Sequence, residues 1–263
     1  MKVQDALSGQ NLPKADLEIL LSWAIAKPRV YLTAHPEHPL TPEELTRFST
    51  ALERRRKHEP IQHITGTQEF YGRMFKTDAR ALVPRGSTED LVRIALEFLQ
   101  DAQRGLSARE EEVDTDIVIT TRALGNIAEA KTVIDIGTGS GAIAITLALE
   151  RPDLRVIATD VSAEALSLAK ENAKALGATI EFREGSCLDP IQDLTEPFVI
   201  VSNPPYIPSG NVLMKDVVDF EPHVALFGGK DGGDIAREIA AQASQHPFCR
   251  GWAMECMGGQ LTV

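Results

Sequence analysis

The chain has few cysteines, few aromatic residues and no excess of positive charge. Its three cysteines, Cys187, Cys249 and Cys256, lack the paired spacing of a zinc site or a disulfide framework. We therefore expect a reducing compartment and no metal site. The formal net charge of −11 argues against non-specific binding to nucleic acid, because neutralising phosphates requires a basic surface.

Long hydrophobic runs are also absent. Residues 1–18 are polar and lack the apolar core of a signal peptide, and no apolar run reaches the roughly 20 residues that span a membrane. These absences predict a cytoplasmic protein that binds no membrane. Hydrophobic residues make up 43% of the chain and aromatic residues only 5%, so we expect a globular protein with a mainly aliphatic core.

The first part of the chain has a helical pattern. Within residues 4–57, apolar residues from Leu17 to Ile25 recur at the spacing of one helix face. A second helix is predicted after Thr41, because Thr41, Pro42 and Glu44 form the sequence of a capping box. The basic run at 53–57 ends this helix, and such a run is more often a solvated helix end than a surface for a partner.

The middle of the chain is less regular. Residues 61–82 contain short β-like stretches separated by glycines, and residues 89–100 have a helical pattern. Residues 101–116 are charged and interrupted by glycine, which predicts a loop or an extension of a connecting element.

After Lys131, strands and helices alternate. The predicted strands are 132–136, 155–159, 180–183 and 198–202, with a fifth beginning near Trp252. The predicted helices are 142–150, 163–176 and 233–244. This alternation predicts an α/β fold with a doubly wound, mostly parallel sheet. In such sheets ligands bind at the carboxyl ends of the strands.

A glycine-rich loop follows the first of these strands. It consists of Asp135, Ile136, Gly137, Thr138, Gly139, Ser140 and Gly141, and a helix follows. Such a loop lets the backbone approach a ligand, and the helix N-terminus offers N–H groups to an anion. Asp160, at the end of the second strand, is placed to accept hydrogen bonds from ribose hydroxyls. The loop also fits a dinucleotide fingerprint, but Asp135 favours S-adenosyl-L-methionine, whose reactive end is cationic.

A second motif, Asn203-Pro204-Pro205-Tyr206, follows the fourth strand. The proline after Asn203 holds this residue extended, and Pro204 has no N–H to compete for nearby carbonyl groups. The Asn203 side-chain oxygen and the Pro204 carbonyl can accept both protons of a planar NH₂ group, and Tyr206 can pack on that group. A proline turn between a strand and a helix is the alternative interpretation.

Together the two motifs resemble those of methyltransferases that act on the planar nitrogen of adenine, cytosine or a glutamine amide. The whole chain resembles the family that methylates the glutamine of the Gly-Gly-Gln motif in peptide chain release factors. The supporting stretches are 59–66, 69–72, 83–85 and 220–232. The resemblance implies S-adenosyl-L-methionine as cofactor and a release factor as protein partner.

The resemblance also implies roles for individual residues. It places the cofactor at Asp135, Gly137, Thr138, Gly139, Ser140, Gly141, Asp160, Cys187 and Asn203. It places the acceptor glutamine at Asn203, Pro204, Pro205 and Tyr206, with Asn203, Pro204 and Tyr206 as catalytic residues. Phe70 and Tyr71 line the site or only pack near it, and Glu221 contacts the substrate or caps a helix.

The implied organisation has three parts. Residues 1–60 form a helical docking domain, residues 61–84 a β-hairpin linker, and residues 85–263 a methyltransferase domain with a seven-stranded type of sheet.

The chain departs from the family pattern at three places. The stretch P-R-P-E-T-E is here Pro84-Arg85-Gly86-Ser87-Thr88-Glu89, and Gly-Asp is here Gly185-Ser186-Cys187, on the adenine side of the cofactor. The family continues beyond the fifth strand through a helix and a β-hairpin, whereas this chain ends at Val263. We therefore expect the C-terminal strands to be missing and the strand near Trp252 to be an exposed edge.

Three alternatives to the release factor remain. A ribosomal-protein glutamine is a possible acceptor, because close relatives share the motif. An adenine N6-methyltransferase of nucleic acid would need base flipping and a basic groove, which the net charge and the helical N-terminal half disfavour. A degenerate copy that binds without catalysis is the third.

Overall fold

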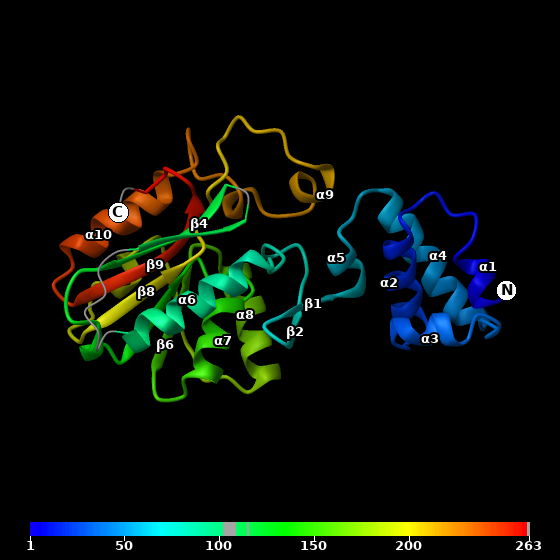
Figure 1. Cartoon of the computed structure of the whole chain (residues 1–263), viewed down its shortest axis with the longest axis horizontal. Helices are drawn as coiled ribbons and strands as arrows, with labels where there is room; N and C mark the ends of the chain where they lie inside the picture. Colours follow the sequence, from blue (N-terminus) through cyan, green and yellow to red (C-terminus); the bar gives the residue numbers. More distant parts are fainter. Residues whose placement is uncertain (102–108, 115, 262–263) are drawn as a thin grey trace. The chain divides into compact units, whose positions relative to one another are not determined.

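The computed structural model describes residues 1–101, 109–114 and 116–261 (Figure 1). Contacts divide the chain into two compact units. The first contains Met1–Thr67 and Leu213–Phe220, and the second contains Gln68–Val212 and Glu221–Val263. Within the described ranges, no helix is long and apolar enough to cross a membrane.

The first unit is built from short helices. They are α1 (Val3–Ala6), α2 (Lys14–Ala24), α3 (Arg29–Ala34), α4 (Pro42–Arg56), α5 (Ile61–Thr65) and α9 (Lys215–Val218). The capping box at the start of α4 is confirmed, because Thr41 Oγ1 accepts a hydrogen bond from the Glu44 backbone N–H at 3.2 Å and the Glu44 carboxylate accepts one from the Thr41 N–H at 2.8 Å. The apolar face of α2 is buried in the core of this unit.

Two arginines of the basic run at the end of α4 form ion pairs within the first unit. Arg55 lies between two carboxylates, at 2.7 Å from Asp16 of α2 and at 3.7 Å from Asp216 of α9. Arg54 pairs with Glu59. Arg55 therefore links α4 to α2 and α9.

The second unit is built on a seven-stranded sheet with the order β3-β4-β9-β8-β5-β6-β7. The strands are β3 (Arg109–Asp114), β4 (Ile117–Ala123), β5 (Thr132–Ile136), β6 (Arg155–Asp160), β7 (Glu181–Glu184), β8 (Phe198–Ser202) and β9 (Cys249–Met257). Strands β5 to β9 are parallel, and β4 is antiparallel to both of its neighbours. Strands β1 (Thr67–Phe70) and β2 (Arg73–Lys76) form a separate two-stranded hairpin. The predicted mostly parallel, doubly wound α/β fold is confirmed.

Helices cover both faces of this sheet (Figure 1). Helices α6 (Ser87–Asp101), α7 (Ala142–Glu150) and α8 (Ala163–Leu176) lie on one face, and α10 (Asp234–Gln245) lies on the other. Three short 3₁₀ helices, Ile127–Glu129, Asp189–Ile191 and His223–Ala225, lie in connecting segments. Alternate residues of the buried strands face the two layers, so Trp252 and Met254 of β9 pack in the core with α10, whereas Ala253 packs in the core with α6 and α7.

The expectation that the strand near Trp252 is an exposed edge is wrong. Strand β9 lies inside the sheet, between β8 and β4, with Ile117 opposite Met257 and Ala123 opposite Gly251. The positions that we expected to be empty are filled by a hairpin of β4 and β3, which precedes β5 in sequence. The outer strand β3 has the sequence R-E-E-E-V-D, and charge on an edge strand opposes pairing with another chain.

For residues 109–114, this hairpin also corrects the prediction that 101–116 form a loop or an extension of a connecting element. Residues 109–114 are a strand, and β4 follows with the β-branched sequence I-V-I-T-T. Residues 102–108 and 115 lie outside the described residues.

Candidate active site

The loops that follow four parallel strands enclose a cavity of about 300 Å³ at the carboxyl edge of the sheet. Three segments contribute that the motifs did not indicate, namely 80–82, 161–165 and 222–227. The lining residues are Arg80, Ala81, Leu82, Ile136, Gly137, Gly139, Asp160, Val161, Ser162, Ala165, Gly185, Ser186, Cys187, Asn203, Pro205, Pro222, Val224, Ala225, Phe227 and Ile235. A cavity therefore lies at the carboxyl ends of the strands, where the sequence predicted a ligand site.

The predicted site residues divide into two groups. Those that line the cavity are Gly137, Gly139, Asp160, Cys187, Asn203 and Pro205. Those that are not among its lining residues are Asp135, Thr138, Ser140, Gly141, Pro204 and Tyr206. The binding roles of both groups stay predictions.

The Asp160 side chain binds the backbone of the glycine loop. Its Oδ2 accepts a hydrogen bond from the Gly139 N–H at 2.9 Å, and its Oδ1 accepts one from the Ser162 N–H at 2.9 Å. Gly139 has a φ of +56°, a conformation in which a side chain would be strained. Burial raises the pKa of Asp160, and backbone hydrogen bonds oppose that effect. Each carboxylate oxygen has a further lone pair for a ligand hydroxyl.

Asp135 is fully buried at the end of β5. Its Oδ2 accepts hydrogen bonds from the Thr138 hydroxyl at 2.6 Å and from the Ala144 N–H at 3.1 Å, whereas Oδ1 has no hydrogen-bond partner among the described residues. Burial raises the pKa of Asp135 to about 7. Asp135 therefore braces the loop from within.

The rest of the glycine loop is held from α8. The Asn172 side chain donates to the Ser140 carbonyl at 2.9 Å and accepts from the Lys76 N–H at 2.8 Å. A Cβ on Gly141 would lie 2.8 Å from Ile145. Thus Ser140 and Gly141 shape the turn, and they do not line the cavity.

The loop after β7 brings Cys187 to the cavity wall. Cys187 has a φ of +45°, and its thiol, whose pKa burial raises, lies 3.7 Å from the Ser186 hydroxyl. The neighbouring Gly185 packs against Pro190. The segment that the sequence predicts to lie beside the adenine of the cofactor therefore presents Ser186 and a neutral thiol to the cavity.

The N-P-P-Y motif begins where β8 ends. Ser202, the last residue of β8, donates to the Ile136 carbonyl at 2.7 Å, which ties this motif to the glycine loop. Asn203 lines the cavity, and its Nδ2 donates to the Thr88 hydroxyl at 2.9 Å. Asn203 therefore turns its amide nitrogen toward α6.

Tyr206 is fixed from three directions. Its hydroxyl donates to Glu255 at 3.1 Å, and its backbone carbonyl accepts from the Gln260 side chain at 2.9 Å. Gly232 packs so closely that a Cβ there would lie 2.0 Å from the Tyr206 carbonyl oxygen. Neither Glu255 nor Gln260 was a candidate from the sequence.

The other candidates have contacts of their own. Glu221 is buried, accepts from the Val83 N–H at 3.1 Å and pairs with Arg85, so it joins two segments that form the cavity wall. Phe70 is buried and stacks edge to face on Phe75, which favours packing over a place in the wall. The Tyr71 backbone N–H donates to Glu89.

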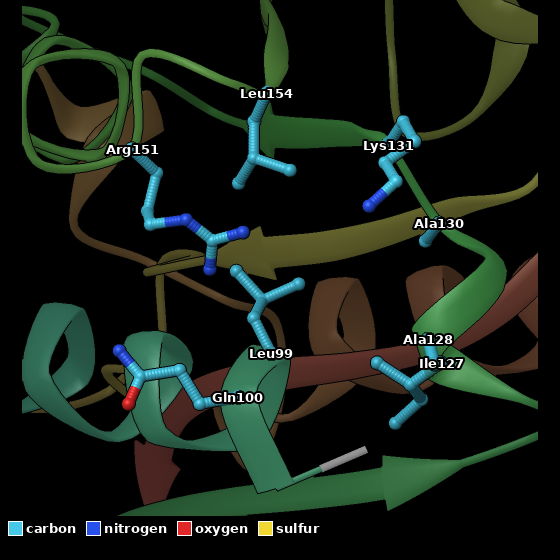
Figure 2. A pocket seen from close by; sticks show the side chains of 8 residues that line it. All are labelled: Leu99, Gln100, Ile127, Ala128, Ala130, Lys131, Arg151 and Leu154. Carbon is cyan, nitrogen blue, oxygen red and sulfur yellow. The ribbon is translucent and has the colours of Figure 1, made fainter. Parts of the chain in front are cut away.

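A second cavity, of about 350 Å³, lies near the amino ends of β5 and β6 (Figure 2). The Lys131 and Arg151 side chains extend into it from opposite sides, and Arg151 pairs with Asp153. It contains none of the predicted site residues. Over the described ranges no group of histidine, cysteine and acidic side chains is arranged to hold a metal ion.

Comparison with known proteins identifies the family of the chain. Residues 2–66 match the PrmC N-terminal domain, and residues 93–219 match the methyltransferase small domain. A release factor glutamine methyltransferase of Koribacter versatilis is 39% identical over 94% of this chain and 79% of its own length. One of Aliivibrio fischeri is 36% identical over 94% of this chain and 78% of its own length. Among solved structures, the catalytic domain of hMettl16 covers 89% of this chain and 76% of its own, with 14% identity and a TM-score of 0.49, which adds nothing to the assignment.

The fold and the two motifs define a methyltransferase enzyme. More narrowly, the chain belongs to the release factor glutamine methyltransferase family.

Proposed function

We propose that this enzyme transfers a methyl group from S-adenosyl-L-methionine to the side-chain amide nitrogen of the glutamine in the Gly-Gly-Gln motif of a peptide chain release factor. One observation carries the proposal: Asn203 of N-P-P-Y lies on the same cavity as Gly139 and Asp160. A planar nitrogen held by Asn203 would therefore lie close to a ligand bound by the glycine loop.

The chain's residues fit S-adenosyl-L-methionine. A cavity of about 300 Å³ is at the lower end of the range for small-molecule sites. Asp160 lines the cavity and has free lone pairs for ribose hydroxyls, and the buried Asp135 Oδ1 has no hydrogen-bond partner among the described residues. Bound there, the cofactor supplies an electrophilic methyl group carried on a sulfonium.

Asn203 and Pro204 act on the acceptor. Two oxygens, the Asn203 Oδ1 and the Pro204 carbonyl, would accept hydrogen bonds from the two amide N–H groups and orient the nitrogen toward the cofactor site. The bound cofactor would supply the methyl group from its sulfonium, and the methylated nitrogen would release one proton to water. No strong base is needed, because the N-methylated nitrogen is acidic before it loses this proton. Positioning and hydrogen bonding are the chain's contribution.

The proposal includes a division of labour. Residues 1–60 dock the release factor, residues 61–84 link the two parts, and residues 85–263 carry out the transfer. A release factor acts in translation, so the proposed location is the cytoplasm. The glutamine methyltransferases among the relatives favour this acceptor over adenine.

The test is transfer of labelled methyl from the cofactor to a purified release factor. We expect label in the wild-type factor and none in a factor whose Gly-Gly-Gln glutamine is replaced by alanine. Duplex DNA and a glutamine-bearing ribosomal protein, offered at the same concentration, are expected to stay unlabelled. Label in either of these and none in the release factor would reject the proposal.

A further inference from the structure

A buried carboxyl group stands behind the acceptor motif. Glu255 lies on β9 and is fully buried, and the pairing of Ser202 with Met254 places it beside Asn203. Unpaired carboxylates are rarely buried, because desolvation is costly. Neither motif in the sequence includes Glu255, but its hydrogen-bond donor Tyr206 belongs to N-P-P-Y.

Its neighbours come from the N-P-P-Y motif and from the start of α6. The Tyr206 hydroxyl donates to Glu255 Oε1 at 3.1 Å, and Ser87 Oγ lies 3.5 Å from the same oxygen. Oε2 has no partner in hydrogen-bond geometry among the described residues. Burial raises the pKa of Glu255, and contacts with Thr88, Tyr206, Ser87 and Asn203 lower it.

We propose that Glu255 is a positioning residue that sets the direction of the hydrogen bonds at the acceptor site, acting through Thr88 on Asn203 and directly on Tyr206. This inference rests on the function proposed above and deepens it: it says how the site selects an NH₂ group.

The direction of these hydrogen bonds follows from which groups can donate a hydrogen and which can only accept one. An ionised carboxylate only accepts hydrogen bonds. Thr88 Oγ1 already accepts from Asn203 Nδ2, so its own hydrogen is left for Glu255, whose Oε2 is open to it. The amide nitrogen of Asn203 is thereby held toward Thr88, and Oδ1 is left as the polar atom for the cavity.

The ionised form of Glu255 has local support. Ser87 and Thr88 are the first residues of the 15-residue helix α6, and a helix N-terminus favours a negative charge. The Tyr206 hydroxyl is likewise fixed as a donor to Glu255.

Substrate selection is the consequence. An acceptor with two N–H donors meets the Asn203 oxygen and the Pro204 carbonyl, both acceptors. A carboxylate in place of the glutamine amide would meet the same two acceptors and find no donor. The site therefore takes a primary amide and rejects the glutamate side chain of the same shape.

Glu255→Gln tests this inference with little change of shape. A glutamine can turn its NH₂ toward Thr88, which reverses the chain and brings the Asn203 nitrogen to the cavity. The Asn203 NH₂ group would then face the NH₂ group of the acceptor, and two donors cannot form a hydrogen bond. We therefore expect kcat for release factor methylation to fall at least about tenfold. The affinity for the cofactor, measured by calorimetry, should stay within about twofold.

Thr88 supplies the matched comparison. Thr88→Val removes the hydroxyl at nearly constant volume and should lower kcat like Glu255→Gln, whereas Thr88→Ser keeps the hydroxyl and should restore it. Thr146→Val is the control, because Thr146 is a fully buried threonine whose Oγ1 has no partner among the described residues. The double variant Thr88→Val/Glu255→Gln should be about as slow as the slower single variant, since the two residues act in one chain.

The possible outcomes distinguish failure of the proposed function from failure of the role proposed for Glu255. If the wild-type enzyme does not methylate the glutamine, the proposed function fails. If the wild-type enzyme is active and folded Glu255→Gln matches it in kcat, or the two substitutions multiply in the double variant, only the role of Glu255 is overturned. Reduced kcat in Glu255→Gln and Thr88→Val, with rescue by Thr88→Ser, supports it.

Discussion

The two ends of the cavity are built differently. At the proposed cofactor end, Asp160 holds the glycine loop through backbone N–H groups, and Asp135 braces it from within. At the proposed acceptor end, Asn203 is held by Thr88 of α6, and Tyr206 is held by Glu255 of β9. The contacts at the first end shape the backbone of the loop that we propose binds the cofactor, whereas the side-chain hydrogen bonds at the second end orient the residues that we propose hold the acceptor. We therefore expect substitutions at the first end to alter binding, and substitutions at the second to alter turnover.

The largest effect on turnover is expected for Asn203→Ala. This substitution removes an oxygen that we propose holds the acceptor nitrogen, and loss of such a group costs roughly 10²–10³-fold in kcat. Cofactor affinity should fall much less. Single-turnover methylation and calorimetry measure the two quantities. Retained turnover would remove Asn203 from the mechanism and with it the contrast between the two ends.

At the opposite end, Asp160→Asn should weaken cofactor binding by roughly 10–100-fold, because it removes the charge from hydrogen bonds to ribose hydroxyls and to the Gly139 N–H. At saturating cofactor, kcat should return to near the wild-type value. Titration calorimetry gives the dissociation constant. A variant with normal affinity and low kcat would place Asp160 at the acceptor end instead.

Gly232→Ala tests the close packing behind Tyr206. The new Cβ would lie 2.0 Å from the Tyr206 carbonyl oxygen, at a φ of +84° that disfavours a side chain. We expect a loss of about 2–3 kcal/mol in the free energy of unfolding, together with a lower kcat. Gly210→Ala is the control, because a Cβ at that residue would have nothing within 4 Å and its φ is not positive. Equal denaturant midpoints for the two variants would contradict the packing argument.

The smallest effect concerns pH. Because burial raises the pKa of Asp135 to about 7, the folded chain binds a proton there that the unfolded chain has lost. This contribution to stability is present at low pH and is lost as pH rises toward 7 and beyond. Between pH 5 and pH 7 the wild type should lose roughly 2 kcal/mol relative to Asp135→Asn, which has no such proton. Urea unfolding of the ligand-free proteins at both pH values measures the difference, and parallel curves would show that Asp135 stays ionised.

The sequence predicts the cofactor end better than the acceptor end because its determinants are contiguous. The glycine loop and the strands around it have clear periodicity, and β5, β8, α7 and α8 begin and end where the pattern indicates. The hairpin of β3 and β4 was missed, since the acidic sequence R-E-E-E-V-D is typical of a solvated loop. Only its pairing with β4 makes it a strand, and that pairing is not visible in the local sequence.

Glu255 was missed for a different reason. It lies more than fifty residues from Asn203 along the chain, and the pairing of β8 with β9 brings the two together. One signal was available: a single acidic residue inside the apolar stretch W-A-M-E-C-M is unusual for a buried strand. The wall segments 80–82 and 222–227 carry no such signal, because apolar residues in connecting segments do not reveal what they face.

The measurement that tests the central claim most directly is mass spectrometry of a release factor after incubation with this enzyme and S-adenosyl-L-methionine. The account predicts one added methyl group on the Gly-Gly-Gln peptide, located on the glutamine side chain, and no addition when that residue is glutamate. An unmodified glutamine with an active, cofactor-binding enzyme, or a methyl group on another residue, would contradict it.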